Sequence, residues 1–190
     1  QNLALEEKQA REKSLNDSVK NGQHLMMRIG ESRDALTKFQ AGGGKEALAK
    51  VAQTAQAFGI PNSIVDKIAG GDLAAAQEFQ KLAVQQAMET LKQSIDGSGR
   101  ITQAEFGIFQ QNNPNLNTDP RAIEKVYNFA TKVYNLDKAE SDAMVHFKSI
   151  PDADITQFPN WWANKAQVDG LVTPKIVTGE AKGTEKSNQQ

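Results

Sequence analysis

The stretch LAAAQEFQKLAVQQAMETLKQS, residues 73–94, determines the fold class expected for this chain. Its apolar side chains recur every three or four residues, which predicts an α-helix with one buried face. Asp72 precedes the stretch and is a residue type that caps helix N-termini. Ala and Gln fill most of the other positions and also favour helix. The whole chain contains 24 Ala and 18 Gln among its 190 residues.

Before this stretch the same spacing predicts more helices. Residues 2–40 contain no Pro, and their apolar positions predict one long helix or two in series, with a bend expected near Gly22 and Gly30. We interpret residues 1–40 as a coiled-coil-like arm whose apolar stripe needs a neighbour. Gly-rich residues 42–44 predict a break, followed by helices over 45–58 and about 62–69.

Beyond residue 94 helical patterns continue. Asp119-Pro120 is a helix start signal, and the helix it opens is predicted to run to about Lys148, before Pro151. A short helix with Trp161-Trp162 is expected to close a small core, and Glu140 to lie on a solvated face. The sequence therefore predicts an all-α, elongated multi-helix domain over 41–167, with a disordered or extended tail over 168–190.

Composition excludes several classes of function. The 22 Lys and Arg nearly balance the 23 Asp and Glu, whereas nucleic-acid-binding domains usually carry a basic excess. No apolar run is long enough to span a bilayer. The chain has no Cys and only two His, so thiolate or His-based catalysis and His-rich metal sites are not expected, and we expect no enzyme.

The chain begins at Gln1 without a leader, and we expect it to be a piece of a longer protein.

One motif has the residue spacing of a metal-binding loop. SIDGSGRITQAE, residues 94–105, is similar to the calcium loop of EF-hands. The ligand positions fall on Ser94, Asp96, Ser98, Arg100 (through its backbone carbonyl) and Glu105, with the required Gly at Gly99. Two departures stand out: Ser94 replaces the usual first Asp, and no second loop is present to pair with this one.

The motif has two interpretations. The first is a weak, degenerate calcium site, which makes calcium the one cofactor considered for this chain. The second is a helix–turn–helix hinge in which Ile101 enters the core and Thr102 and Glu105 form a capping box for the next helix. The hinge explains every residue without a metal, and we favour it.

Three segments resemble a helical domain of bacteriophage virion proteins, namely the internal, DNA-ejection or tail-associated proteins of short-tailed phages. The segments are AQEFQKLAVQQAMETL (76–91), GSGRITQAEFGIFQQNNPNLNTDPRAIEKVYNFATKVY (97–134) and FPNWW (158–162). The resemblance is one of pattern and provides no catalytic residues to transfer.

The resemblance implies a structural or ejection role through helix-mediated assembly. Its expected partners are other virion proteins and further copies of the chain itself. The expected location is the virion and, after ejection, the host periplasm or envelope. Two alternatives remain open: a calcium-responsive binding module built on residues 94–105, and a generic helical adaptor or effector fragment.

Overall fold

The computed structural model describes residues 2–40, 42, 44–96 and 100–173. This part of the chain is all-α, as predicted, and contains no strand. The helices are α1 (Asn2–Gln40), α2 (Gly44–Ala57), α3 (Asn62–Ala69), α4 (Leu73–Asp96), α5 (Arg100–Asn112), α6 (Ala122–Lys148) and α7 (Phe158–Val168), with the short 3₁₀ turns η1 (Leu116–Thr118) and η2 (Ile155–Gln157).

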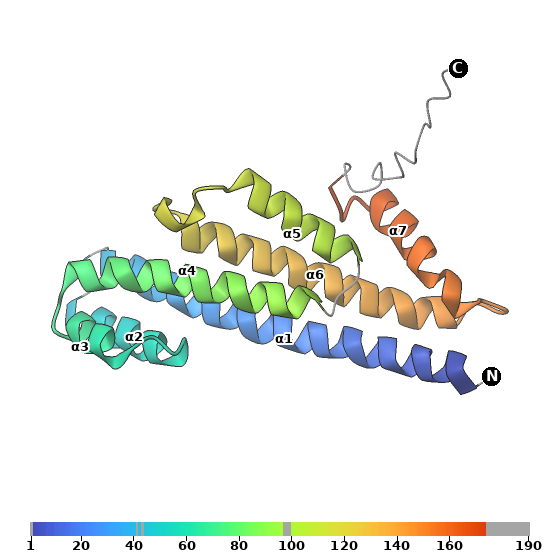
Figure 1. Ribbon diagram of the computed structural model, residues 1–190, viewed down its shortest axis with the longest axis horizontal. Coiled ribbons are helices and arrows are strands. Elements are labelled where there is room, and N and C mark those ends of the chain that lie inside the picture. Colours follow the sequence, from blue (N-terminus) through green and yellow to red (C-terminus); the bar gives the residue numbers. More distant parts are fainter. Residues whose placement is uncertain (1, 41, 43, 97–99, 174–190) are drawn as a thin grey trace, which may run out of the picture.

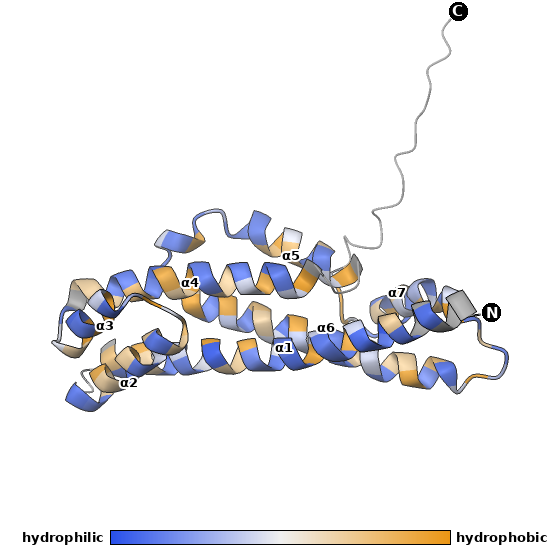
Figure 2. Ribbon diagram, turned by 60° about the horizontal axis from the view of Figure 1, so that its bottom comes forward, coloured by the Kyte–Doolittle hydropathy of each residue, from blue (hydrophilic) through white to orange (hydrophobic). Residues whose placement is uncertain are grey.

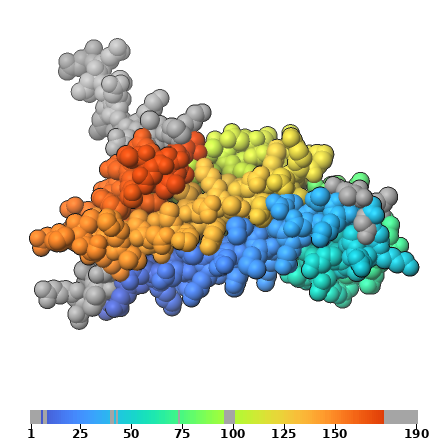
Figure 3. All heavy atoms as spheres, turned by 180° about the vertical axis from the view of Figure 1, so that it is seen from behind, coloured from blue at the N-terminus to red at the C-terminus, as the bar shows by residue number. Residues whose placement is uncertain are grey.

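The molecule is elongated because its two longest helices lie side by side along the long axis. α1 and α6 contact each other over most of their length (Figures 1 and 3). α4 runs antiparallel to α1 and covers its C-terminal half, while α2 and α3 close that end of the molecule. α5 lies along α6, and α7 folds back over the other end of α6.

The buried apolar side chains form two separate clusters. The first and larger cluster joins α2–α6 to the C-terminal half of α1, which contributes Leu25, Ile29 and Leu36. The second cluster lies between the end of α6 and α7, and among the described side chains of α1 it receives Leu15. In Figure 2 hydrophobic and hydrophilic residues alternate along each helix, as expected for amphipathic helices that share a core.

α1 continues through Gly22 and Gly30, where a bend was expected. Both glycines face tyrosines of α6. A Cβ at Gly22 would lie 3.8 Å from atoms of Tyr134, and one at Gly30 would lie 3.1 Å from Cε2 of Tyr127. These glycines therefore allow α6 to approach α1 closely rather than bending α1.

Helix ends largely follow the local signals. Asp72 caps α4, because its Oδ1 accepts a hydrogen bond of 2.8 Å from the backbone N–H of Ala74. α6 begins at Ala122, two residues after Pro120, and the Oδ1 of Asp119 accepts the N–H of Arg121 at 2.8 Å.

The segment after α7 differs from the expected tail up to residue 173. Val172 is buried in the second cluster, and Thr173 is hydrogen-bonded to α5. The rest of the predicted tail, 174–190, lies outside the described residues. Within the described part, no helix combines the length and the apolar character needed to cross a bilayer.

Candidate functional site

The predicted loop lies at the junction of α4 and α5. α4 ends at Asp96 and α5 begins at Arg100. Ser98 and its two flanking glycines lie outside the described residues, as do the side chains of Asp96 and Arg100. Of the five predicted ligand positions, the structure therefore places the side chains of Ser94 and Glu105.

Glu105 is held by partners far along the chain. Its carboxylate accepts hydrogen bonds from Nζ of Lys132 at 2.5 Å, and from the backbone N and Oγ1 of Thr173 at 2.5 and 2.9 Å. Burial alone would raise the pKa of Glu105, but these bonds outweigh it and hold the pKa below its ordinary value. The carboxylate that would be the main calcium ligand is thus neutralised by Lys132.

The predicted capping box is wrong. Thr102 lies inside α5, which already begins at Arg100, and its hydroxyl donates to Oδ1 of Asp137 on α6 at 3.2 Å. Glu105, its expected capping partner, bonds to Lys132 and Thr173 instead. Both polar residues join α5 to other elements because their side chains point into the interior, with exposed fractions of 1% and 3%.

Ser94 and Glu105 line different cavities. Ser94 borders a slot between α1 and α4, whereas Glu105 borders a groove between α5 and α6. Among the described residues no group of three or more His, Asp or Glu side chains is arranged to hold a metal ion.

A second polar feature, which we call the acidic seam, consists of Asp137 and Glu140 on α6 with their partners. Glu140 was expected on a solvated face but is buried between α1 and α7. Its Oε1 lies 3.5 Å from Nη2 of Arg11, and Trp162 also hydrogen-bonds to it. The guanidinium of Arg11 lies 5.5 Å from the centre of the Phe158 ring. Residues from α1, α6 and α7 therefore meet at this carboxylate.

The acidic seam contains two carboxylates with one cation. Burial raises the pKa of Asp137 to about 6, an effect opposed by the Thr102 hydrogen bond and increased by the charge of Glu140. Burial also raises the pKa of Glu140, against the opposing effects of Arg11 and Trp162. Oδ2 of Asp137 is buried without a hydrogen-bond partner in the described structure. Ionised Asp137 is therefore a destabilising element at neutral pH.

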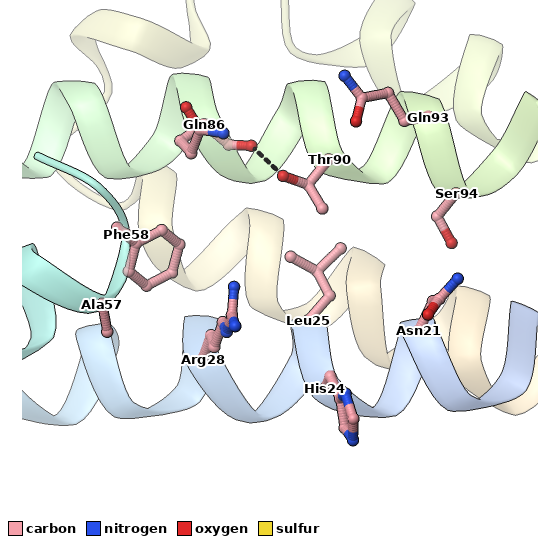
Figure 4. A pocket seen from close by; sticks show the side chains of 10 residues that line it. All are labelled: Asn21, His24, Leu25, Arg28, Ala57, Phe58, Gln86, Thr90, Gln93 and Ser94. Atoms are coloured by element: carbon pink, nitrogen blue, oxygen red, sulfur yellow. Dashed lines mark hydrogen bonds between the residues drawn. The ribbon is translucent and has the colours of Figure 1, made fainter.

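The slot between α1 and α4 is built by two antiparallel helix faces (Figure 4). Asn21, Leu25 and Arg28 project from α1 at helical spacing, opposite Ser94, Thr90 and Gln86 of α4. The ring of Phe58, from the turn after α2, closes the end nearest Arg28, and His24 points away from the slot. The cavity has a volume of about 370 Å³.

The polar groups of the slot are only partly satisfied. The Thr90 hydroxyl donates to the backbone oxygen of Gln86 at 2.8 Å, but the buried Oγ of Ser94 has no hydrogen-bond partner within the described part of the chain. Arg28 forms no ion pair with the other described residues. Among the described residues no carboxylate lines the cavity, and its lining carries the permanent positive charge of Arg28.

The groove between α5 and α6 has a comparable volume of about 380 Å³. Phe109 and Phe129 stack in it with their centroids 4.3 Å apart. Its two lysines are already paired, Lys125 with Asp119 at 2.6 Å and Lys132 with Glu105. The groove therefore offers less unpaired charge to a ligand than the slot does.

Trp161 and Trp162 close the second apolar cluster, as the sequence predicted. Trp162 has an exposed fraction of 3%, and Trp161 packs against Phe147 with their ring centroids 5.1 Å apart. Neither tryptophan forms a flat exposed platform, because both rings contribute to the packing between α6 and α7.

The slot was not predicted from the sequence, although a signal for it exists. Gln86, Thr90 and Ser94 recur every four residues on α4, and form a polar stripe beside its apolar face. What the spacing does not reveal is which other helix this stripe faces.

Searches of protein-family models, curated proteins and solved structures found nothing that matches the chain.

Proposed function

We propose that this chain is a structural component of a bacteriophage virion that acts by helix-mediated assembly with other virion proteins and with itself. The observation that carries the proposal is the unequal attachment of the two halves of α1. The C-terminal half contributes Leu25, Ile29 and Leu36 to the first apolar cluster, whereas Leu15 is the one described residue of the N-terminal half that belongs to either cluster. Such a half-helix is suited to exchange its intramolecular neighbour for a partner helix.

The contacts of the N-terminal half are mostly polar. Between residues 9 and 24, Leu15 is the one large apolar side chain that is fully buried among those described. Burying a Leu contributes about 1.5–3 kcal/mol. The ion pairs Arg11–Glu140 and Glu12–Lys148 link this half to α6. The partly exposed Glu12–Lys148 pair adds about 0–1 kcal/mol, whereas the carboxylate of the Arg11–Glu140 pair is buried.

The resemblance of residues 97–134 to phage virion proteins supports the virion context. The decisive experiment is mass spectrometry of purified phage particles before and after genome release. Peptides present in full particles and lost from emptied ones identify an ejected internal protein, and peptides retained in both identify a fixed tail component. Absence from both would overturn the proposal and favour the adaptor interpretation.

A second experiment tests the exchange of the N-terminal half directly. Asn16 and Ser141 face each other, with Oδ1 and Oγ 3.4 Å apart, and the chain has no natural Cys. The double variant Asn16→Cys/Ser141→Cys puts one thiol on each side of this contact, and oxidation is used to join them in a disulfide. We expect sedimentation to show self-association of the reduced protein and none of the oxidised protein. The single variant Asn16→Cys controls for the thiol, and equal association in both redox states would contradict the exchange.

A further inference from the structure

We propose that the slot between α1 and α4 binds a small organic carboxylate that carries a second polar oxygen at its far end. The inference rests on the lining of the cavity and does not depend on the proposed role in a virion. At about 370 Å³ the cavity lies toward the small end of ligand-binding pockets.

The positive charge of the slot lining favours an anionic ligand. The guanidinium of Arg28 points into the slot beside the Phe58 ring (Figure 4). It has no carboxylate partner among the described residues, and none of the ten lining residues is acidic. A carboxylate complements a guanidinium well, because it accepts two parallel N–H bonds from the same group.

The other end of the slot selects a neutral oxygen. The hydroxyl of Ser94 is buried without a hydrogen-bond partner among the residues that the structure describes, and it lies opposite the Asn21 amide. Both groups can donate and accept hydrogen bonds, so a ligand hydroxyl or carbonyl would satisfy them. Leu25 separates the two ends and provides an apolar middle.

The helix geometry sets the length of the ligand. Asn21 and Arg28 are seven residues apart on α1, which corresponds to roughly 10 Å along the helix axis. A ligand with its carboxylate at Arg28 and its oxygen at Ser94 therefore needs a short aliphatic spacer. ω-Hydroxyhexanoate is a probe of this kind, and two analogues each lack one of its features: ω-hydroxyhexanamide lacks the charge, and hexanoate lacks the hydroxyl.

The test is titration of the ¹⁵N-labelled full chain with the three probes at millimolar concentrations, followed by NMR. We expect ω-hydroxyhexanoate to give saturable shifts at the backbone amides of 21–28 and 86–94. The uncharged amide should give none, and hexanoate should bind more weakly. Arg28→Gln should weaken binding of ω-hydroxyhexanoate by about tenfold or more, since one charged hydrogen-bonded pair is lost.

Two variants separate specific binding from general charge effects. Arg121→Gln removes an equal charge from an arginine whose side chain is 81% exposed outside the slot, and should leave binding unchanged. Ser94→Ala should weaken binding of ω-hydroxyhexanoate several-fold but leave hexanoate unaffected, because hexanoate has no oxygen at that end. Absence of saturable shifts with every probe, equal losses in both arginine variants, or equal binding of the uncharged amide would each overturn the proposal.

Discussion

Glu105 holds Thr173, a residue 68 positions further along the chain, by hydrogen bonds from both its backbone N–H and its hydroxyl. Lys132 of α6 donates to the same carboxylate. One side chain of α5 thus attaches α6 and the segment that follows α7. A residue first considered as a metal ligand is the centre of a tertiary contact.

Replacing Glu105 by Gln removes the charge while keeping the shape. We expect the free energy of unfolding at neutral pH to fall by about 1–3 kcal/mol, the range found for hydrogen bonds to charged groups, as measured by urea denaturation. The pKa of Glu105 lies below its ordinary value although burial opposes this, so the contribution should disappear as the pH falls through that lowered pKa.

The matched control is Glu124→Gln, because Glu124 is 48% exposed and its carboxylate lies 3.7 Å from Arg33. We expect this variant to stay within about 0.5 kcal/mol of the wild type. Equal losses of unfolding free energy in the two variants would show that the contacts of Glu105 stabilise the fold no more than those of Glu124.

Asp137→Asn should be more stable than the wild type at neutral pH, and this advantage should disappear at acidic pH. Because burial raises the pKa of Asp137 from 3.8 to about 6, the folded state binds a proton more tightly than the unfolded state. Stability is then highest below the unfolded pKa and falls as the pH rises through about 6. The difference between a pKa of 3.8 and one of about 6 corresponds to about 3 kcal/mol in the free energy of unfolding.

The measurement is urea denaturation across the range from about pH 4 to 7.5 for wild type and variant. The free energy of unfolding of Asp137→Asn should exceed that of the wild type by an amount that increases with pH. Asp142→Asn is the control, since Asp142 lies on the same helix with its side chain 69% exposed. Parallel curves for wild type and Asp137→Asn would contradict the raised pKa.

Gly22→Ala and Gly30→Ala should differ although both glycines lie within α1. A Cβ at Gly22 meets only ordinary contacts at 3.8 Å, so Ala should stabilise the helix by about 1 kcal/mol through its propensity. A Cβ at Gly30 approaches the Tyr127 ring to 3.1 Å, and Arg33 stacks over that ring at 4.0 Å. The overpacking offsets the gain at Gly30.

Thermal unfolding of the two glycine variants tests this difference. We expect Gly22→Ala to melt above the wild type and Gly30→Ala to melt below Gly22→Ala. Equal gains at both positions would show that Tyr127 moves aside without cost, and that the close approach of α6 does not require Gly30.

Millimolar calcium should leave the melting temperature unchanged. An EF-hand needs the carboxylate at its last position as a bidentate ligand, and Glu105 is already neutralised by Lys132. Any bound calcium would stabilise the fold by RT ln(1 + [Ca]/Kd), so a weak site is detectable in a thermal shift experiment. A rise in the wild type that is absent from Glu105→Gln would contradict this prediction and support the calcium site.

Local sequence signals were sufficient to predict where the helices lie. The helix predicted over 45–58 is observed as Gly44–Ala57, and the helix predicted to end near Lys148 ends there. Asp72 caps α4 as its residue type and position indicated. Helical spacing and capping depend on residues three or four positions apart, so they are readable without knowledge of the fold.

The roles of the polar side chains depended on tertiary structure. Thr102 and Glu105 have the spacing of a capping box, yet Thr102 bonds to Asp137, and Glu105 bonds to Thr173. Glu140 is a charged residue type that is usually found at the surface, yet it is buried against Arg11, 129 positions away. The slot likewise needs α1 and α4 to meet in one antiparallel register.

The sequence by itself therefore determined where helices form and which faces are apolar. Only the tertiary structure decided which polar groups are buried and what they bind. The physical reason is range: a helix forms from contacts within one turn, whereas a buried carboxylate finds its partner only after helices distant in sequence have packed together.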